Sequence, residues 1–191
     1  MKQRWAVVVM GAWLMGTVCT SVVATENFYT IDRLLAGSPN KSFTAAVQQL
    51  GQSQARELLR YLSSELNRLY FQMWNVAQLV LGGLVLWLVV GSRQQDPARA
   101  RRAVRGVLAM LAIVVAMLVW LTPSIVSLGR SLDFVPRDPP PPGLQRFWVL
   151  HAAYTSLEML KLTVGVVITW WIVTWSRAGS ETPVRSTNPV S

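Results

Sequence analysis

The only histidine of the chain, His151, shares the stretch 147–175 with one glutamate, Glu158, and one lysine, Lys161. The surrounding residues are mostly apolar. Glu158 and Lys161 are three residues apart, so on a helix their side chains can form an ion pair. Charged groups within a membrane helix are costly, and they are expected to pair or to face a wet cavity. One interpretation is an internal ion pair that fixes the register of the helix. The other is a proton or ion relay, or an anion site that uses Lys161.

His151 is the candidate cofactor ligand, because one imidazole suffices as the axial ligand of a haem or a chlorophyll-type pigment. There is no second histidine for a bis-histidine haem or a zinc cluster, so no metal site is predicted. The alternative is an interfacial histidine that only hydrogen-bonds. On a helical wheel, small or polar residues fall within about 40° of His151. They are Thr155, Glu158, Gly165 and Thr169, with Tyr154 and Lys161 along one side.

A second polar group lies in another apolar run, where Asn75, Gln78 and Gly82 share one helical face. Buried amides in a membrane usually hydrogen-bond across helices, which is a structural role. Together with the last helix they could instead line a path. The predicted intramembrane polar face comprises Asn75, Gln78, Tyr154, Thr155, Glu158 and Lys161.

The elements that carry these residues are helices of a membrane protein. Hydrophobic residues make up 52% of the 191-residue chain and charged residues 14%, which is unusual for a soluble domain. Four apolar runs are long enough to span a bilayer, at about 5–24, 74–91, 104–128 and 147–175. The predicted fold is therefore all-α, a single integral membrane bundle of four transmembrane helices.

The first run follows Lys2 and Arg4, which is also the design of a cleavable signal peptide, with a cleavage site at Val22-Val23-Ala24. Its length favours a retained helix. Cys19, the only cysteine, is predicted to be a buried small apolar residue.

Between the first two spans, a polar connection over 25–41 precedes an amphipathic helix over about 43–73 with Ser42 as its N-cap. This helix is predicted to lie outside the membrane and can run directly into the next span. It could pack on its own bundle, on the membrane surface or on a partner helix.

Gly91 is predicted to end the second span, and an arginine-rich cytoplasmic loop follows over 92–105. Pro123 is expected to kink or end the third span. A proline-rich outer loop then covers 129–146, and the tail 176–191 is predicted to be disordered.

The charges predict the orientation. With four spans and both termini inside, the inner segments carry nine basic and two acidic residues, and the outer segments carry eight basic and six acidic residues. This asymmetry follows the positive-inside rule and indicates a multi-pass protein of a bacterial-type inner (cytoplasmic) membrane.

The order of features resembles a family of small four-helix membrane proteins of unknown function, related to a eukaryotic transmembrane protein linked to cisplatin resistance. The similarity includes GAWLMGTV in the first helix, YFQMWNVAQLVLGG in the second, the arginine-rich turn, the apolar helix near Pro123 and RFWVLHAAYTSLEMLKL in the last. In the last helix, the residues that resemble the family's pattern are Phe147, Leu150, His151 and Thr155. Glu158 stands where that family often has asparagine. The resemblance implies a helical membrane bundle and supplies no activity.

The chain has no serine elbow, phosphate-binding loop, dinucleotide fingerprint or paired-cysteine motif, so an enzyme is not predicted. Its basic residues gather beside the apolar runs, which excludes a nucleic-acid patch. The lipid bilayer and other membrane subunits are the predicted partners. The predicted function is an accessory or assembly subunit of a larger membrane complex, for example a bioenergetic one. The alternative is a small homo-oligomeric transporter or ion-binding protein that uses the polar face of the last helix.

Overall fold

The computed structural model describes residues 1–92 and 96–178, and these residues form helices without any strand. The elements are α1 (Lys2–Gly37), α2 (Lys41–Leu50), α3 (Gln52–Val90), α4 (Pro97–Ala116), the π-helix η1 (Met117–Leu121), α5 (Thr122–Ser131) and α6 (Leu144–Ala178). Four helical segments are long and apolar enough to cross a membrane: α1, α3, the continuous segment Pro97–Ser131, and α6. The prediction of an all-helical chain with four long apolar helices is confirmed.

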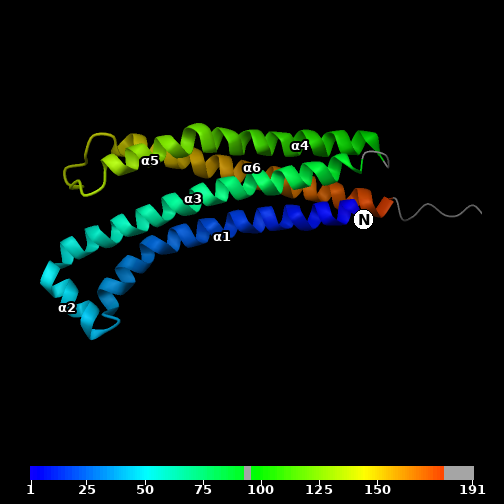
Figure 1. The fold of residues 1–191 in the computed structure, drawn as a ribbon. Helices are drawn as coiled ribbons and strands as arrows, with labels where there is room; N and C mark the ends of the chain where they lie inside the picture. The colour runs from blue at the N-terminus through cyan, green and yellow to red at the C-terminus, as the bar shows by residue number, and fades with distance from the viewer. Residues whose placement is uncertain (93–95, 179–191) are drawn as a thin grey trace, which may run out of the picture.

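The four long segments form an antiparallel bundle in which α1 packs on α3 and α6, and α4 packs on the same two helices (Figure 1). The ends of α3 and α6 therefore lie at the same end of the bundle as the starts of α1 and α4.

The helices of the bundle pack through buried side chains that follow a heptad pattern. Buried positions recur at intervals of three and four residues, or of seven, as in left-handed coiled coils. They are Ala6, Met10, Trp13, Thr17, Ala24 and Ile31 in α1; Asn75, Gln78, Gly82, Val85 and Val89 in α3; Ala103, Val107, Met110, Val114, Met117 and Leu121 in α4 and η1; and Tyr154, Glu158, Lys161, Gly165, Ile168 and Ile172 in α6.

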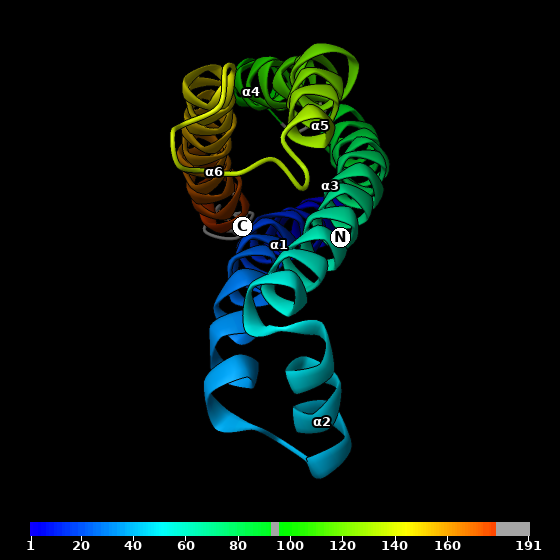
Figure 2. The same ribbon diagram turned by 90° about the vertical axis from the view of Figure 1, so that its left-hand side faces the viewer.

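Beyond the bundle, α1 continues as a helix into the segment 25–41 that was predicted to be a polar connection, and it ends at Gly37. Contacts with α3 explain the extension. Asn27 donates to Asn67 Oδ1 at 2.7 Å, and the amide of Asn67 donates to the carbonyl of Ala24 at 2.9 Å. The end of α1, α2 and the start of α3 form an arm that extends to one side of the bundle (Figure 2).

The amphipathic segment predicted as one helix over 43–73 is divided in the structure. It breaks at Gly51, whose φ of 84° is a conformation that favours glycine. The first piece, α2, begins one residue before the predicted cap Ser42, because the side chain of Asn40 accepts a hydrogen bond from the Phe43 amide at 2.7 Å. The second piece, α3, runs without interruption from Gln52 to Val90, so the amphipathic and apolar segments form one helix.

At the other end of the bundle, Gly91 caps α3 as predicted. The predicted loop 92–105 is shorter, since α4 begins at Pro97. Asp96 caps α4 by accepting hydrogen bonds from the amides of Ala98 and Arg99 at 3.1 and 3.0 Å. The predicted disordered tail, apart from its first three residues in α6, lies outside the described residues.

Pro123 does not end the third apolar helix. Proline lacks an amide hydrogen and its ring clashes with the carbonyl four residues earlier in a regular α-helix. The chain instead widens into the π-helix just before Pro123, and the Thr122 amide bonds to Met117 O. Helix α5 then continues to Ser131, so the predicted loop 129–146 is reduced to residues 132–143.

Candidate functional site

The most concentrated chemistry of the described chain lies inside the bundle, in a polar layer to which every long helical segment contributes. Its members are Trp13 of α1, Asn75 and Gln78 of α3, Thr122 at the start of α5, and Glu158 and Lys161 of α6. Asn75 and Gln78 are completely buried. The heptad seam places all but Thr122 on the inner faces of their helices.

Lys161 is 1% exposed and lies at the centre of this layer. Its ammonium nitrogen donates to Gln78 Oε1 and lies 2.7 Å from Glu158 Oε2, one turn earlier on α6. The same Gln78 oxygen accepts a hydrogen bond from the Trp13 indole at 3.0 Å. One amide oxygen therefore joins α1, α3 and α6.

The fourth helical segment joins through Asn75. Its amide nitrogen donates to Thr122 Oγ1 at 3.0 Å, and its oxygen is 3.5 Å from the Gln78 amide nitrogen, a long hydrogen bond. Glu158 is thus ion-paired to Lys161, and a hydrogen-bonded chain runs from Lys161 through two amides to Thr122.

Burying these charges has a large energetic cost. Moving an ion out of water costs several kcal/mol even after relaxation, and only close partners offset it. Removing one member of a buried ion pair costs about 3–5 kcal/mol, because the other charge loses its partner. A shift in helix register would separate these partners and leave the charges unpaired.

Besides the buried indole nitrogen of Trp74, two groups at the polar layer lack a hydrogen-bond partner among the described residues. One is the hydroxyl of Tyr154, which is 7% exposed, and the other is the carboxylate of Glu158, which is 4% exposed. Oxygen Oε2 of Glu158 forms the ion pair with Lys161, and neither carboxylate oxygen has a hydrogen-bond partner.

The structure brings together four of the predicted polar-face residues: Asn75, Gln78, Glu158 and Lys161. Tyr154 lies one turn above them on the same buried face. Thr155 does not join them, because it is exposed and donates only to the carbonyl of His151 on its own helix, at 3.1 Å. The predicted face, centred on His151, is therefore rotated relative to the buried one.

Sequence reasoning missed Trp13 and Thr122. The burial of Trp13 could have been predicted, since its spacing from Ala6, Met10 and Thr17 places it in the heptad series of α1. The contact of Thr122 with Asn75 could not, because it depends on how α3 and α5 meet.

His151 lies in the N-terminal part of α6, two turns before Glu158. Its ring is half-buried and stacks on Phe147 at a centroid distance of 5.9 Å, and Trp148 packs edge-on at 6.1 Å. Within the described residues, no group of three or more His, Cys, Asp or Glu side chains could hold a metal ion. A haem or pigment ligand at His151 stays a prediction.

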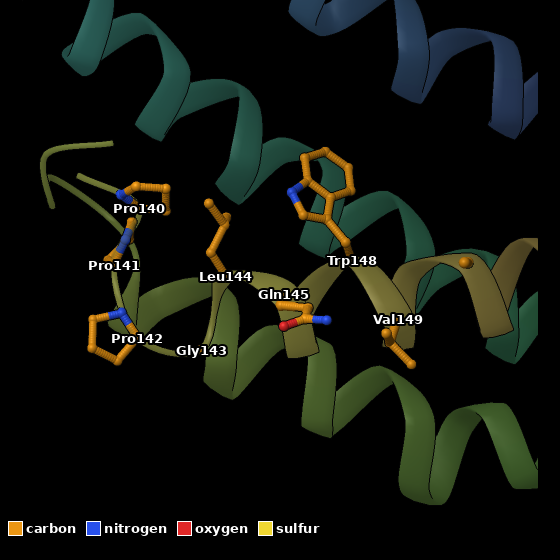
Figure 3. Close-up of a pocket in the computed structure, with 9 residues that line it drawn as sticks. Pro140, Pro141, Pro142, Gly143, Leu144, Gln145, Trp148 and Val149 are labelled. Carbon is orange, nitrogen blue, oxygen red and sulfur yellow. The ribbon is translucent and has the colours of Figure 1, made fainter. Parts of the chain in front are cut away.

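Two open grooves lie on the outside of the bundle. Figure 3 shows the first, beside the start of α6, which is lined by Pro140, Pro141, Pro142, Gly143, Leu144, Gln145, Trp148, Val149 and Ala152. The second, between α1 and α3, is lined by Cys19, Thr20, Val23, Tyr70, Met73, Trp74 and Ala77. Cys19 is exposed there, so its predicted burial is wrong. Neither groove is lined by a residue of the polar layer.

Comparisons with protein-family models, with curated proteins and with solved structures found no match for this chain.

Proposed function

We propose that this protein is a non-enzymatic accessory or assembly subunit of a larger complex in a bacterial-type inner membrane, with both termini in the cytoplasm. The excess of basic residues on the inner segments supports this orientation. In this arrangement the arm lies on the outer side of the membrane, next to the bilayer.

The observation that carries the proposal is an uncovered apolar face on α3, which we call the α3 stripe. All of its side chains are at least 40% exposed, and they follow one side of the helix at intervals of three, four or seven residues. They are Leu58, Leu62, Leu69, Met73, Val76, Val80, Leu84 and Trp87.

The α3 stripe is too long to be covered by lipid alone. Thirty residues of helix rise about 43 Å from first to last, whereas the hydrocarbon core of a bilayer is roughly 30 Å thick. If Trp87 lies at the inner interface, the outer end of the stripe extends roughly 13 Å beyond the hydrocarbon. Leu58 and Leu62, 53% and 54% exposed, then require another cover.

An apolar helix of a partner membrane protein fits this outer end of the stripe. Helices pack side by side through apolar stripes with this spacing. A partner helix would therefore continue the contact from the membrane into the arm. Exposed leucines in a row are typical of interaction sites rather than of water-facing surfaces.

The alternative is a homo-oligomeric transporter or ion-binding protein that uses the polar layer. It has less support, because Lys161, Gln78 and Asn75 already bond to one another within one protomer. None of them lines either groove.

The test is the native mass of the tagged full-length protein, extracted from its own membranes in a very mild detergent. We expect it to migrate with a much larger complex. Replacing Leu58 and Leu62 by glutamine should release it from that complex while the protein still accumulates in the membrane. The matched control replaces the exposed polar residues Ser53 and Gln54, also on the arm, by alanine and should leave the complex intact. A wild-type particle of one to a few copies of this chain would refute the proposal.

A further inference from the structure

A second conclusion comes from the two unpartnered groups at the polar layer, and it does not depend on the proposed function. Tyr154 and Glu158 are four residues apart on α6, so their side chains share one face and are separated by a single turn. Both are more than nine-tenths buried. One is a hydroxyl that can donate and the other a carboxylate that can only accept when it is ionised.

Leaving both groups without partners inside a membrane bundle is energetically unfavourable. A buried hydroxyl without a hydrogen bond costs on the order of 1–3 kcal/mol in proteins, and a carboxylate oxygen costs more. Buried polar groups of this kind are normally satisfied by protein atoms or by an ordered water.

The nearby protein atoms are already engaged or apolar. Asn75 donates to Thr122, and Lys161 bonds to Gln78 and contacts Glu158 through Oε2. The ring of Tyr154 packs edge-on against Phe71 at 5.2 Å and against Met117 and Leu121.

The helix that faces Tyr154 is also irregular at this depth. Met117 and Leu121, the first and last residues of the π-helix, form one buried cluster with Tyr154. Single π-turns inside α-helices are frequent at functional sites, because the extra residue widens the turn. A wider turn next to two unpartnered polar groups is the expected geometry of a small buried binding site.

We propose that the bundle holds one water molecule at this point. The water accepts the hydrogen bond of the Tyr154 hydroxyl and donates to Oε1 of Glu158. It completes the polar layer on the side where Lys161 does not reach, and it extends the network from the ion pair to the level of the π-helix.

The test is hydroxyl-radical footprinting of the full-length protein in lipid nanodiscs prepared in H2(18)O. Radiolysis of a bound water oxidises the side chains beside it, and methionine is a sensitive reporter. Met117 packs against Tyr154, whereas Met110 lies in the apolar core of the bundle, and both are completely buried. We expect Met117 and Tyr154 to take up the label several-fold more than Met110. Equal protection of Met117 and Met110 would overturn the proposal.

A variant pair locates the water. Tyr154→Phe keeps the ring and removes the hydroxyl, so labelling of Met117 should fall several-fold. Tyr70→Phe, on the lipid side of α3 at the second groove, is the matched control and should leave Met117 labelling as in the wild type. If Tyr154→Phe changes nothing at Met117 while Met117 is labelled, the water is not bound by Tyr154 and the assignment is wrong.

Discussion

At the scale of single residues, the buried ammonium group of Lys161 requires acceptor oxygens from its neighbours. It lies between the carboxylate of Glu158 and the amide oxygen of Gln78, and these two acceptors come from different helices. The pair Glu158–Lys161 could be predicted from the spacing of the two residues. The third partner could not, because nothing in the sequence indicates which amide of α3 faces α6.

Lys161→Met should show the energetic value of this arrangement. The methionine has similar length but no donor, so Glu158 is left as a buried group without a counter-charge. We expect a loss of about 3–5 kcal/mol in the free energy of unfolding. Thermal unfolding of the purified protein in detergent measures it. Adding Glu158→Gln should recover part of the loss, and a single variant as stable as the wild type would contradict the ion-pair role.

Two threonines, Thr122 inside the polar layer and Thr155 outside it, make a matched comparison. Thr122→Val removes the acceptor of the Asn75 amide and should cost about 1 kcal/mol, as is typical for hydrogen bonds between membrane helices. Thr155→Val removes only a bond to the carbonyl of its own helix and should be neutral. The same unfolding measurement distinguishes them; an equal effect of both would show that the Asn75–Thr122 contact contributes nothing.

The misplacement of Thr155 has a physical reason. A helical wheel of one helix shows where polar residues gather, but the buried face is chosen by the three helices that surround it. In α6 that face is centred on Tyr154, Lys161 and Gly165, so Thr155 lies at its far side and is exposed.

At the scale of elements, glycines decide how closely the helices approach. Gly82 of α3 faces both neighbours, since a Cβ atom there would lie 2.5 Å from Leu111 of α4 and 2.8 Å from Trp13 of α1. The next residue, Gly83, has no atom within 4 Å of the same position. The two glycines are adjacent in sequence, but Gly82 is tightly packed and Gly83 faces open space.

Gly82→Ala should therefore push Trp13 away from Gln78 and lower the unfolding temperature of the bundle. Overpacking of this kind typically costs about 1–3 kcal/mol. Gly83→Ala, with open space around it, should be neutral or slightly stabilising because alanine favours the helix by up to about 1 kcal/mol. Thermal unfolding of both variants is the measurement, and equal destabilisation by the two would refute the packing argument.

How far elements could be predicted depended on whether their signal was local. The four apolar helices and the cap at Gly91 follow from hydropathy and from glycine. The extension of α1 to Gly37 depends on contacts of Asn27 and Asn67, 40 residues apart, which no local pattern contains. The break at Gly51 had a local sign, because the apolar series of the amphipathic segment skips a position at Gln54.

At the scale of the whole molecule, the end of the bundle where α5 stops is joined to the base of the arm by an ionic cluster. Arg68 of α3 is hydrogen-bonded to Glu65, and it reaches Asp133 after α5 at 2.8 Å. Arg130 lies 3.6 Å from the other oxygen of Glu65. The segment that connects α5 to α6 is therefore held at the same end of the molecule as the arm.

Cysteine labelling tests the orientation that the proposed function requires. In a Cys19→Ser background, Phe134→Cys should react with a membrane-impermeant maleimide on intact cells, because Phe134 is exposed at the end of the bundle that the proposal places outside. Arg102→Cys, at the exposed opposite end near the start of α4, should react only after the membrane is permeabilised. The reverse pattern would place both termini outside the cytoplasm.

The position of the polar layer along the chain has a consequence for biogenesis. Ribosomes make the helices in order, so Trp13, Asn75, Gln78 and Thr122 are all synthesised before Lys161. The last helix carries the two charges, and its own partners on α1 and α3 are then already available beside the insertion site. In a chain that lacks those earlier side chains, Lys161 would enter the membrane without its amide partner. The last helix would then pack poorly, and quality-control proteases would degrade the protein.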